Sequence, residues 1–196
     1  MAKPTATVSK DETFDNGTYF IDYKVDLKHR RIDITGDIDA ESISRHINAI
    51  RLMLTENTEK PIDVYISSDG GCIYSGLRLY NVLRASPALT RTHGEGSVFS
   101  MAFVLYLAGD ERYAAPDVSF MNHPMYGGAE GDPDQQQSDV NENKRIEKRC
   151  NEIIIERTGR AASYWKKDGC DRKNVYYPKA RALKCGIVTH EEYEVI

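Results

Sequence analysis

The sequence lacks a long hydrophobic run, because its longest apolar segment spans only residues 101–108, far too few to cross a bilayer. Its first residues contain no apolar segment of the signal-peptide type, so we expect a cytoplasmic protein with no membrane partner. Its four cysteines, Cys72, Cys150, Cys170 and Cys185, form no CxxC pair and no metal-ligand spacing. This pattern predicts reduced thiols and no bound metal.

Excess positive charge is also missing. The net charge of -4 gives no electrostatic reason to expect nucleic acid as a partner. The 196 residues, 40% of them hydrophobic and 29% charged, suit one globular domain with a buried core. Residues 1–22 are polar and predict a flexible N-terminal arm, which leaves a single domain over residues 23–196. No motif indicates a cofactor.

Alternating strand and helix patterns follow the arm. Strands are predicted at residues 31–35, 62–66, 88–92 and 118–122. Helices are predicted from an N-cap at Asp39 to about residue 54, and at residues 73–83, 100–108, about 135–158 and 179–184. Residues 93–96 (HGEG) predict a turn. The order predicts an α/β fold with a largely parallel sheet, and the apolar helix after Ser100 should be buried at its centre.

Two of these strand–helix junctions carry residues that suit ligand binding or catalysis. Gly70 and Gly71 follow a strand and precede a helix, where glycines let backbone N–H groups approach a ligand or a developing oxyanion. A tight turn that needs positive φ is the commoner explanation of such a glycine pair. Ser100 stands at the start of the buried helix, where a serine is either an N-cap or a nucleophile. In the second case the next N–H group would stabilise the oxyanion of the tetrahedral intermediate.

A histidine at a strand end offers the base that such a serine needs. His123 precedes Pro124, which stops strand pairing and places the imidazole at the rim of the sheet. Neutral imidazole accepts a hydroxyl proton near pH 7. A histidine with a purely structural role is the simpler interpretation of this residue alone.

Taken in order, these segments resemble the ClpP family, the proteolytic subunit of the Clp protease. The matching segments are residues 34–36 (ITG, family LTG), 65–71 (YISSDGG, family YINSPGG), 96–102 (GSVFSMA, family GxAASMG), 121–124 (MNHP, family MIHQP) and 181–188 (RALKCGIV, family EAxEYGLVD). The similarity runs from about residue 31 to residue 189. It implies a crotonase-like spiral of ββα units with a protruding handle helix, in a handle region of about residues 125–160.

The resemblance also implies an activity and an assembly. Ser100 would be the nucleophile and His123 the base of a serine endopeptidase, with the N–H groups of Gly71 and Met101 as the oxyanion hole. Gly70 and Met125 would bind substrate. Two stacked heptameric rings would enclose a chamber that receives unfolded polypeptide from an AAA+ unfoldase.

Three positions depart from the family pattern. The third triad position, an Asp in the family, falls on Asn174, and Asp→Asn lowers kcat by about 10⁴-fold in a trypsin-type triad. Asn still orients the base in papain-like sites, so we predict a slow or conditionally active triad of Ser100, His123 and Asn174. Asp171 could take the place of Asn174 only if the local backbone differs from that of the family. Asp69 replaces a proline beside the substrate backbone, and Asp63 replaces a tyrosine of the unfoldase-docking pocket, which predicts a charge in an apolar groove.

These departures leave two assemblies and two roles open. The subunit is either an active peptidase or a catalytically weak ring subunit, and the ring is either uniform or mixed with a more typical paralogue. An acyl-CoA hydratase or isomerase of the same fold superfamily is disfavoured, because no carboxylate faces the expected oxyanion hole and no basic loop suits coenzyme A.

Overall fold

A seven-stranded sheet forms the centre of the protein, seen here in a computed structural model that describes residues 16–126, 128 and 130–193. The strands are β1 (Val25–Asp26), β2 (Arg31–Thr35), β3 (Ile62–Ser68), β4 (Thr90–Phe99), β5 (Glu111–Ala114), β6 (Ser119–Asn122) and β7 (Val175–Pro178). They follow the order β1-β2-β3-β4-β6-β7, with β5 also paired to β4. The inner strands pair in parallel, and β1 and β7 are antiparallel to their neighbours. The predicted α/β fold with a largely parallel sheet is confirmed.

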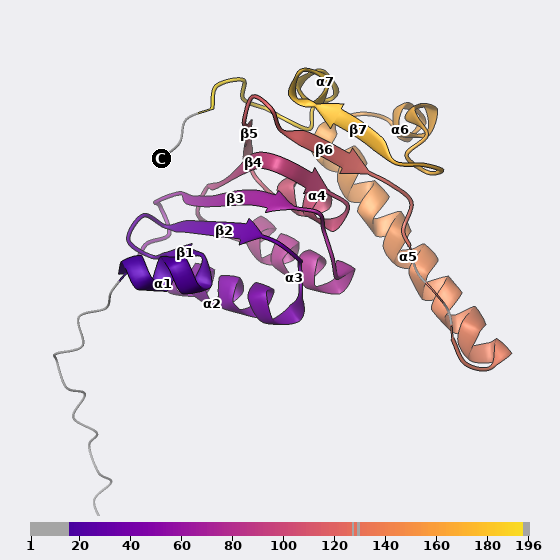
Figure 1. The fold of residues 1–196 in the computed structure, drawn as a ribbon, viewed down its shortest axis with the longest axis horizontal. Coiled ribbons are helices and arrows are strands. Elements are labelled where there is room, and N and C mark those ends of the chain that lie inside the picture. The colour runs from indigo at the N-terminus through magenta and orange to yellow at the C-terminus, as the bar shows by residue number, and fades with distance from the viewer. Residues whose placement is uncertain (1–15, 127, 129, 194–196) are drawn as a thin grey trace, which may run out of the picture.

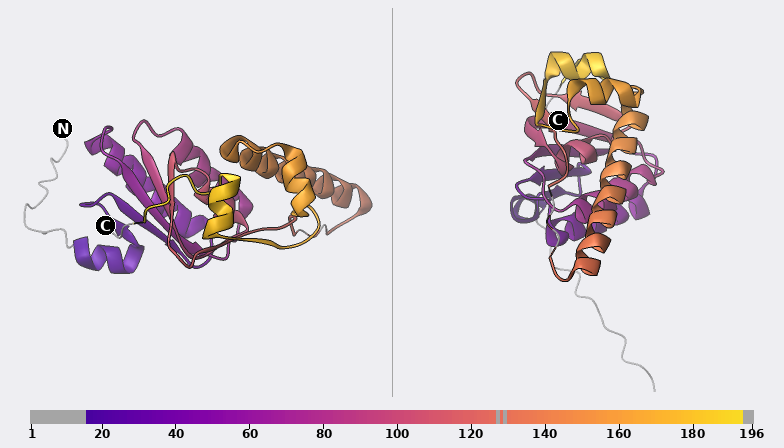
Figure 2. Two further views of the ribbon diagram at one scale, coloured as in Figure 1. Left: turned by 90° about the horizontal axis from the view of Figure 1, so that it is seen from above. Right: turned by 90° about the vertical axis from the view of Figure 1, so that its right-hand side faces the viewer.

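Helices alternate with these strands. They are α1 (Asn16–Tyr23), α2 (Ala40–Glu56), α3 (Ile73–Arg84), α4 (Met101–Tyr106), α5 (Pro133–Thr158), α6 (Ala162–Asp168) and α7 (Lys179–Cys185). Helices α2 and α3 lie side by side against the sheet, and the long α5 projects well beyond it (Figures 1 and 2). The protruding helix that the sequence predicted is therefore present, and it begins where Asp132 caps the N–H of Gln135 and Pro133 occupies the first turn.

The core is built around α4. Every residue from Met101 to Ala108 is buried, as the apolar run predicted. The helix is shorter than expected and ends at Tyr106 rather than at Ala108. Gly109 stands in the short connection between α4 and β5. It lies so close to β4 that an added Cβ would stand 2.3 Å from Thr92 Oγ1, which leaves room only for glycine.

The turn predicted at residues 93–96 is wrong, because β4 runs without a break through these residues. Gly94 lies beneath the Phe120 ring, where an added Cβ would stand 3.1 Å from Phe120 Cζ. Gly96 has a φ of +54° at the place where the register between β3 and β4 shifts. Here glycine serves close packing and a bulge inside a strand, rather than the end of one.

Residues 16–23, which include the end of the predicted flexible arm, form α1; residues 1–15 lie outside the described residues. The Arg31 guanidinium lies 5.3 Å from the centre of the Phe20 ring, and the N–H of Lys24 donates to the Phe20 carbonyl at the end of the helix. Strands β1, β5 and β7 and helices α1 and α6 were not predicted. From Val25 to Val188 most of the buried apolar side chains form one cluster.

Asp63 does not place an unpaired charge in an apolar groove. It is 5% exposed, and it accepts hydrogen bonds from Arg91 at 2.6 Å and from the His93 ring at 2.8 Å. Burial opposes its ionisation, but the hydrogen bonds from His93 and Arg91 outweigh burial and lower the pKa of Asp63. The His93 ring is itself stacked between Tyr65 and Tyr113.

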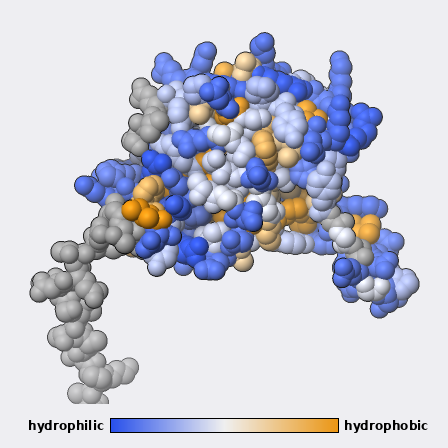
Figure 3. Space-filling model, in the orientation of Figure 1, coloured by the Kyte–Doolittle hydropathy of each residue, from blue (hydrophilic) through white to orange (hydrophobic). Residues whose placement is uncertain are grey.

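The surface is mostly hydrophilic in the view of Figure 3, including the projecting end of α5, and apolar side chains form small separate patches there. Within residues 16–126, 128 and 130–193, no helix is long and apolar enough to cross a membrane. All four cysteines are free thiols.

One buried arginine holds α5 and the C-terminal segment to the sheet. The guanidinium of Arg112, on β5, donates to the carbonyls of Ile187 (2.7 Å), Gly186 (3.0 Å), Arg157 (3.0 Å) and Gly109 (3.2 Å). Burial, aided by the charge of Arg157, lowers the pKa of Arg112 to about 10, so the side chain remains a cation at neutral pH. These bonds supply donors to carbonyls at the end of α5 and after α7, which would otherwise be buried without partners.

We predict that Arg112→Met lowers the free energy of unfolding by about 3 kcal/mol or more, because several buried carbonyls lose their donor. Thermal and denaturant unfolding measure this loss. The matched control is Arg145→Met on α5, whose ion pair with Glu142 is exposed and screened by solvent, so a much smaller loss is expected. Equal losses in the two variants would contradict the anchoring role of Arg112.

Candidate active site

The site lies where the parallel strands reach their carboxyl ends. Phe99, the last residue of β4, pairs with Met121 of β6, so Ser100 and His123 follow neighbouring strands at the same edge. The N–H of Ser100 donates to the Met121 carbonyl at 2.9 Å, which holds the two strand ends together. The carboxyl edge of a parallel sheet is the usual place for a ligand site in α/β proteins.

Ser100 and His123 contact each other directly. His123 Nε2 and Ser100 Oγ are 2.7 Å apart, within hydrogen-bond distance. The imidazole therefore lies where it can accept the hydroxyl proton, as general-base activation of a nucleophile requires. The pairing predicted from the sequence is present in the geometry.

The backbone of Ser100 is strained. Its φ of 54° and ψ of -122° lie outside the regions that L-residues favour, and its side chain makes no N-cap hydrogen bond to α4. The N-cap interpretation therefore does not explain the hydroxyl. Strain of this kind is found preferentially at functional sites, where the surrounding structure enforces it.

The two glycines after β3 are required by close contacts. An added Cβ on Gly70 would stand 2.8 Å from Ser100 Cβ, and one on Gly71 would stand 2.5 Å from the Ile38 carbonyl oxygen. Both have positive φ, +109° and +142°. The Gly71 segment is clamped from the other side, because the N–H of Ile38 donates to the Gly70 carbonyl and the N–H of Cys72 donates to the Ile38 carbonyl.

A pocket of about 320 Å³ opens at this edge. Its lining includes Ser100 and His123 together with Gly71, Met101 and Met125, which the sequence analysis assigned to the oxyanion hole and to substrate binding. Met101 is the first residue of α4, and N–H groups of a first helical turn have no acceptor within the helix. Gly70 lies behind Ser100, where it supports the serine backbone.

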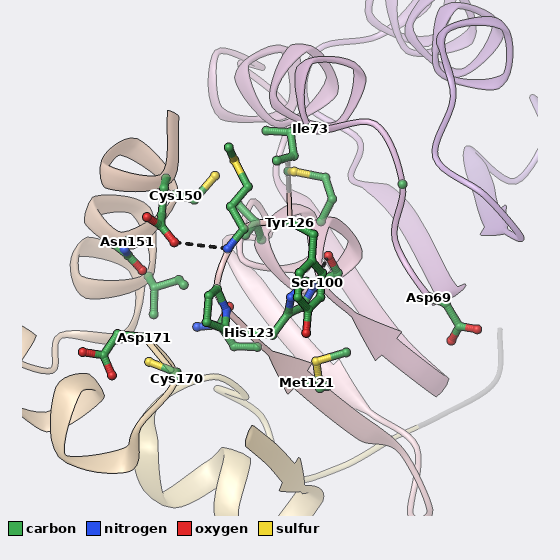
Figure 4. A pocket seen from close by; sticks show the side chains of 18 residues that line it. Asp69, Ile73, Ser100, Met121, His123, Tyr126, Cys150, Asn151, Cys170 and Asp171 are labelled. Atoms are coloured by element: carbon green, nitrogen blue, oxygen red, sulfur yellow. Dashed lines mark hydrogen bonds between the residues drawn. The ribbon is translucent and has the colours of Figure 1, made fainter. Parts of the chain in front are cut away.

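Side chains from several distant segments surround the pair. Figure 4 shows Cys150 and Asn151 of α5 on one side of Ser100 and Asp69 on the opposite side, with Asp171 beyond His123. The Glu147 carboxylate of α5 accepts the N–H of Met125 at 3.1 Å and so ties the long helix to the segment after His123.

Two cysteines of the lining are poor rival nucleophiles. Burial raises the pKa of Cys150 to about 11, and burial also raises the pKa of Cys170. Both thiols are therefore protonated near pH 7, whereas the attacking species is the thiolate. Among the described residues, no group of three or more His, Cys, Asp or Glu side chains is arranged to hold a metal ion.

The third predicted residue makes no hydrogen bond to the base. Asn174 is exposed, and its Oδ1 accepts a hydrogen bond from the Tyr126 hydroxyl at 3.3 Å. His123 Nδ1 is buried and has no hydrogen-bond partner within the described part of the chain. Asp171, the other residue considered for this role, lies in the pocket lining. The structure thus brings together Ser100 and His123 and leaves the outer nitrogen of the imidazole unsupported.

Tyr126 and Glu147 were not predicted as part of the pocket. Glu147 reaches it from a helix that begins only after the loop that follows His123, and no local motif marks that contact. Tyr126 carried a usable signal, because it stands three residues after the candidate base, within reach of its ring.

A serine hydroxyl beside an imidazole, with backbone N–H groups at a sheet edge, is the arrangement of a serine-nucleophile centre on an α/β fold. A family model described as Clp protease matches residues 15–190. The chain belongs to the Clp protease family, a family of serine peptidases, and the mixed α/β architecture is consistent with the ClpP/crotonase fold.

We predict that Gly71→Ala destabilises the protein by about 3 kcal/mol or more, because the new methyl group meets the Ile38 backbone and the φ of +142° is strained for alanine. Thermal unfolding measures the loss. Gly36→Ala is the matched control: its φ is also positive, but its Cβ would meet open space, so about 1 kcal/mol is expected. If both variants lose the same stability, the close approach at Gly71 is not the cause.

Proposed function

We propose that this protein is a serine endopeptidase subunit of a Clp-type compartmentalised protease, which cleaves unfolded polypeptides into short peptides. The 2.7 Å contact between His123 Nε2 and Ser100 Oγ carries the proposal. Membership of the Clp protease family supports it, as do the strained backbone of Ser100 and the close approach of Gly70 to Ser100. We infer a cytoplasmic location from the sequence features described above.

The reaction follows from these groups. Ser100 Oγ attacks the peptide carbonyl carbon while its proton passes to His123 Nε2. The N–H groups of Gly71 and Met101 donate to the carbonyl oxygen as it gains negative charge. The imidazolium then returns the proton to the leaving amine, and an acyl-enzyme forms on Ser100. Water, deprotonated by His123, releases the second product and restores the hydroxyl.

Asn174 is the residue that we propose in third place, and Gly70 and Met125 are the proposed substrate contacts. The Met125 backbone is already held by Glu147, so its segment is ordered beside the nucleophile. A neutral Asn gives the imidazolium less charge stabilisation than an aspartate would, which predicts slower acylation than a full triad allows.

The family implies oligomeric rings and polypeptide substrates. We propose two stacked heptameric rings, composed of this subunit alone or of this subunit and a more typical paralogue, with an AAA+ unfoldase as the source of substrate. The projecting α5 offers a surface for contact between subunits (Figure 1).

A second role, that of a catalytically weak or inactive ring subunit that assembles with an active paralogue, is favoured by one observation. His123 Nδ1 has no partner within the described part of the chain, and Asn174 Oδ1 accepts from Tyr126. An unsupported imidazole is a poorer base than one whose tautomer and orientation are fixed.

We expect a fluorophosphonate to label Ser100 covalently in the assembled protein, and Ser100→Ala to abolish labelling and to lower peptide hydrolysis by about 10⁴-fold or more. Peptide mass spectrometry locates the label. Ser97→Ala is the control, since Ser97 lies on β4 three residues before the nucleophile. Intact labelling in Ser97→Ala and none in Ser100→Ala is the expected pair, and an unlabelled wild-type oligomer would favour the inactive-subunit role.

Mass photometry measures the particle itself. A chain of 22.2 kDa that forms stacked heptamers gives a single large particle at low micromolar concentration, which should survive Ser100→Ala because that change leaves the surface intact. A free monomer would contradict the chamber. A large particle that appears only after mixing with a paralogue would establish the mixed ring.

A further inference from the structure

Tyr126 links the proposed base to the proposed third residue. Its ring stacks on the His123 imidazole with a centroid separation of 4.6 Å and an interplanar angle of 29°. Its hydroxyl donates to Asn174 Oδ1 at 3.3 Å. One side chain thus joins the loop after β6 to the segment before β7, directly over the imidazole.

The imidazole needs such a support because its outer nitrogen has none. His123 Nε2 is engaged with Ser100 Oγ, while Nδ1 is buried and has no hydrogen-bond partner within the described part of the chain. In a complete triad the bond at Nδ1 fixes the ring orientation and stabilises the imidazolium. Here the face of the ring is held instead of its edge.

We propose that Tyr126 is the positioning residue of this site and that Asn174 acts through it. The stacked ring keeps His123 Nε2 directed at Ser100, and the hydrogen bond to Asn174 fixes the tyrosine. The inference rests on the proposed function, since it concerns the same base.

The charge that develops during acylation gives the stacked ring a second effect. When the proton of Ser100 moves to His123 Nε2, the imidazole becomes a cation beside the π face of Tyr126. An aromatic face attracts a cation within about 6 Å of its centre. The neutral Asn174 offers no charge of its own, so the tyrosine ring replaces part of what a carboxylate would supply.

Packing in the core does not explain this placement. Tyr126 is 76% exposed, so it does not fill an interior cavity. Its phenol points back across His123 to a residue 48 positions further along the chain. An exposed side chain with both contacts at the active site indicates a role in that site rather than in folding.

Four variants separate the parts of the proposal: Tyr126→Leu, Tyr126→Phe, Asn174→Ala and the double variant Tyr126→Phe/Asn174→Ala. The measured quantities are kcat and KM for a short fluorogenic peptide and the rate of fluorophosphonate labelling at Ser100. Tyr126→Leu removes the ring, and we expect kcat and the labelling rate to fall about tenfold with KM within about twofold.

Tyr126→Phe keeps the ring and loses only the exposed hydrogen bond, so a decrease of about threefold is expected, as for Asn174→Ala. If Asn174 acts through the tyrosine hydroxyl, the double variant is no slower than either single variant. Tyr74→Leu is the matched control: Tyr74 is also exposed and hydrogen-bonded through its hydroxyl, to Glu142, but lies outside the pocket lining. We expect wild-type rates for it in particles of unchanged mass.

The outcomes that overturn the inference are distinct from failure of the proposed function. Equal labelling rates in the wild type and Tyr126→Leu would overturn the inference alone. So would a double variant whose losses multiply, because Asn174 would then act on His123 directly. A tenfold loss in Asp171→Asn with none in Tyr126→Leu would assign the charge stabilisation to Asp171 instead. A wild type without labelling at Ser100 would overturn the proposed function, and this inference with it.

Discussion

Three backbone segments meet at the end of β3, and their close approach governs the rest of the site. The chain at Gly70 passes so near to Ser100 that a Cβ at Gly70 would clash with the Ser100 Cβ, and a Cβ at Gly71 would clash with the Ile38 backbone. The Ser100 N–H, bonded to Met121, ties this cluster to β6 and so to His123. Because most of these contacts involve backbone atoms, they leave the proposed nucleophile little freedom to move.

Around this rigid centre, the outer parts of the site are held by single polar contacts. Glu147 fixes the Met125 backbone from α5, and Arg112 fixes the end of α5 to β5. The His123 ring is held by a contact between Nε2 and Ser100 and by stacking of one face on Tyr126. The Tyr126 hydroxyl in turn donates to the neutral Asn174. The nucleophile is therefore rigidly placed, whereas the groups that tune the base are fewer and more exposed than in a full triad. Under the proposed function, this difference affects the rate of the reaction rather than its identity.

Local signals predicted much of the fold. Asp39 caps α2 as expected, and the apolar run after Ser100 is the buried centre. The strand before His123 was predicted because Pro124 marks its end, whereas the strand that leads to Ser100 was predicted to stop at residue 92 and in fact continues to Phe99. What local signals missed depends on tertiary contacts: Gly94 and Gly96 lie inside β4 because Phe120 packs on one and a bulge needs the other. The partners of Asn174 and Asp63 lie far away in sequence, so neither the tyrosine contact nor the buried ion pair was visible in the pattern.

The backbone angles of Ser100 also bear on which residue natural selection would favour at this position. At a φ of 54° and a ψ of -122°, a serine is strained by about 1–3 kcal/mol, whereas glycine is nearly free of this strain. In a lineage that no longer needed the hydroxyl, glycine at position 100 would be fixed by its gain in stability alone. A serine at this angle is therefore a residue on which the demands of folding and of chemistry oppose each other, and the chain that keeps it carries the less stable choice.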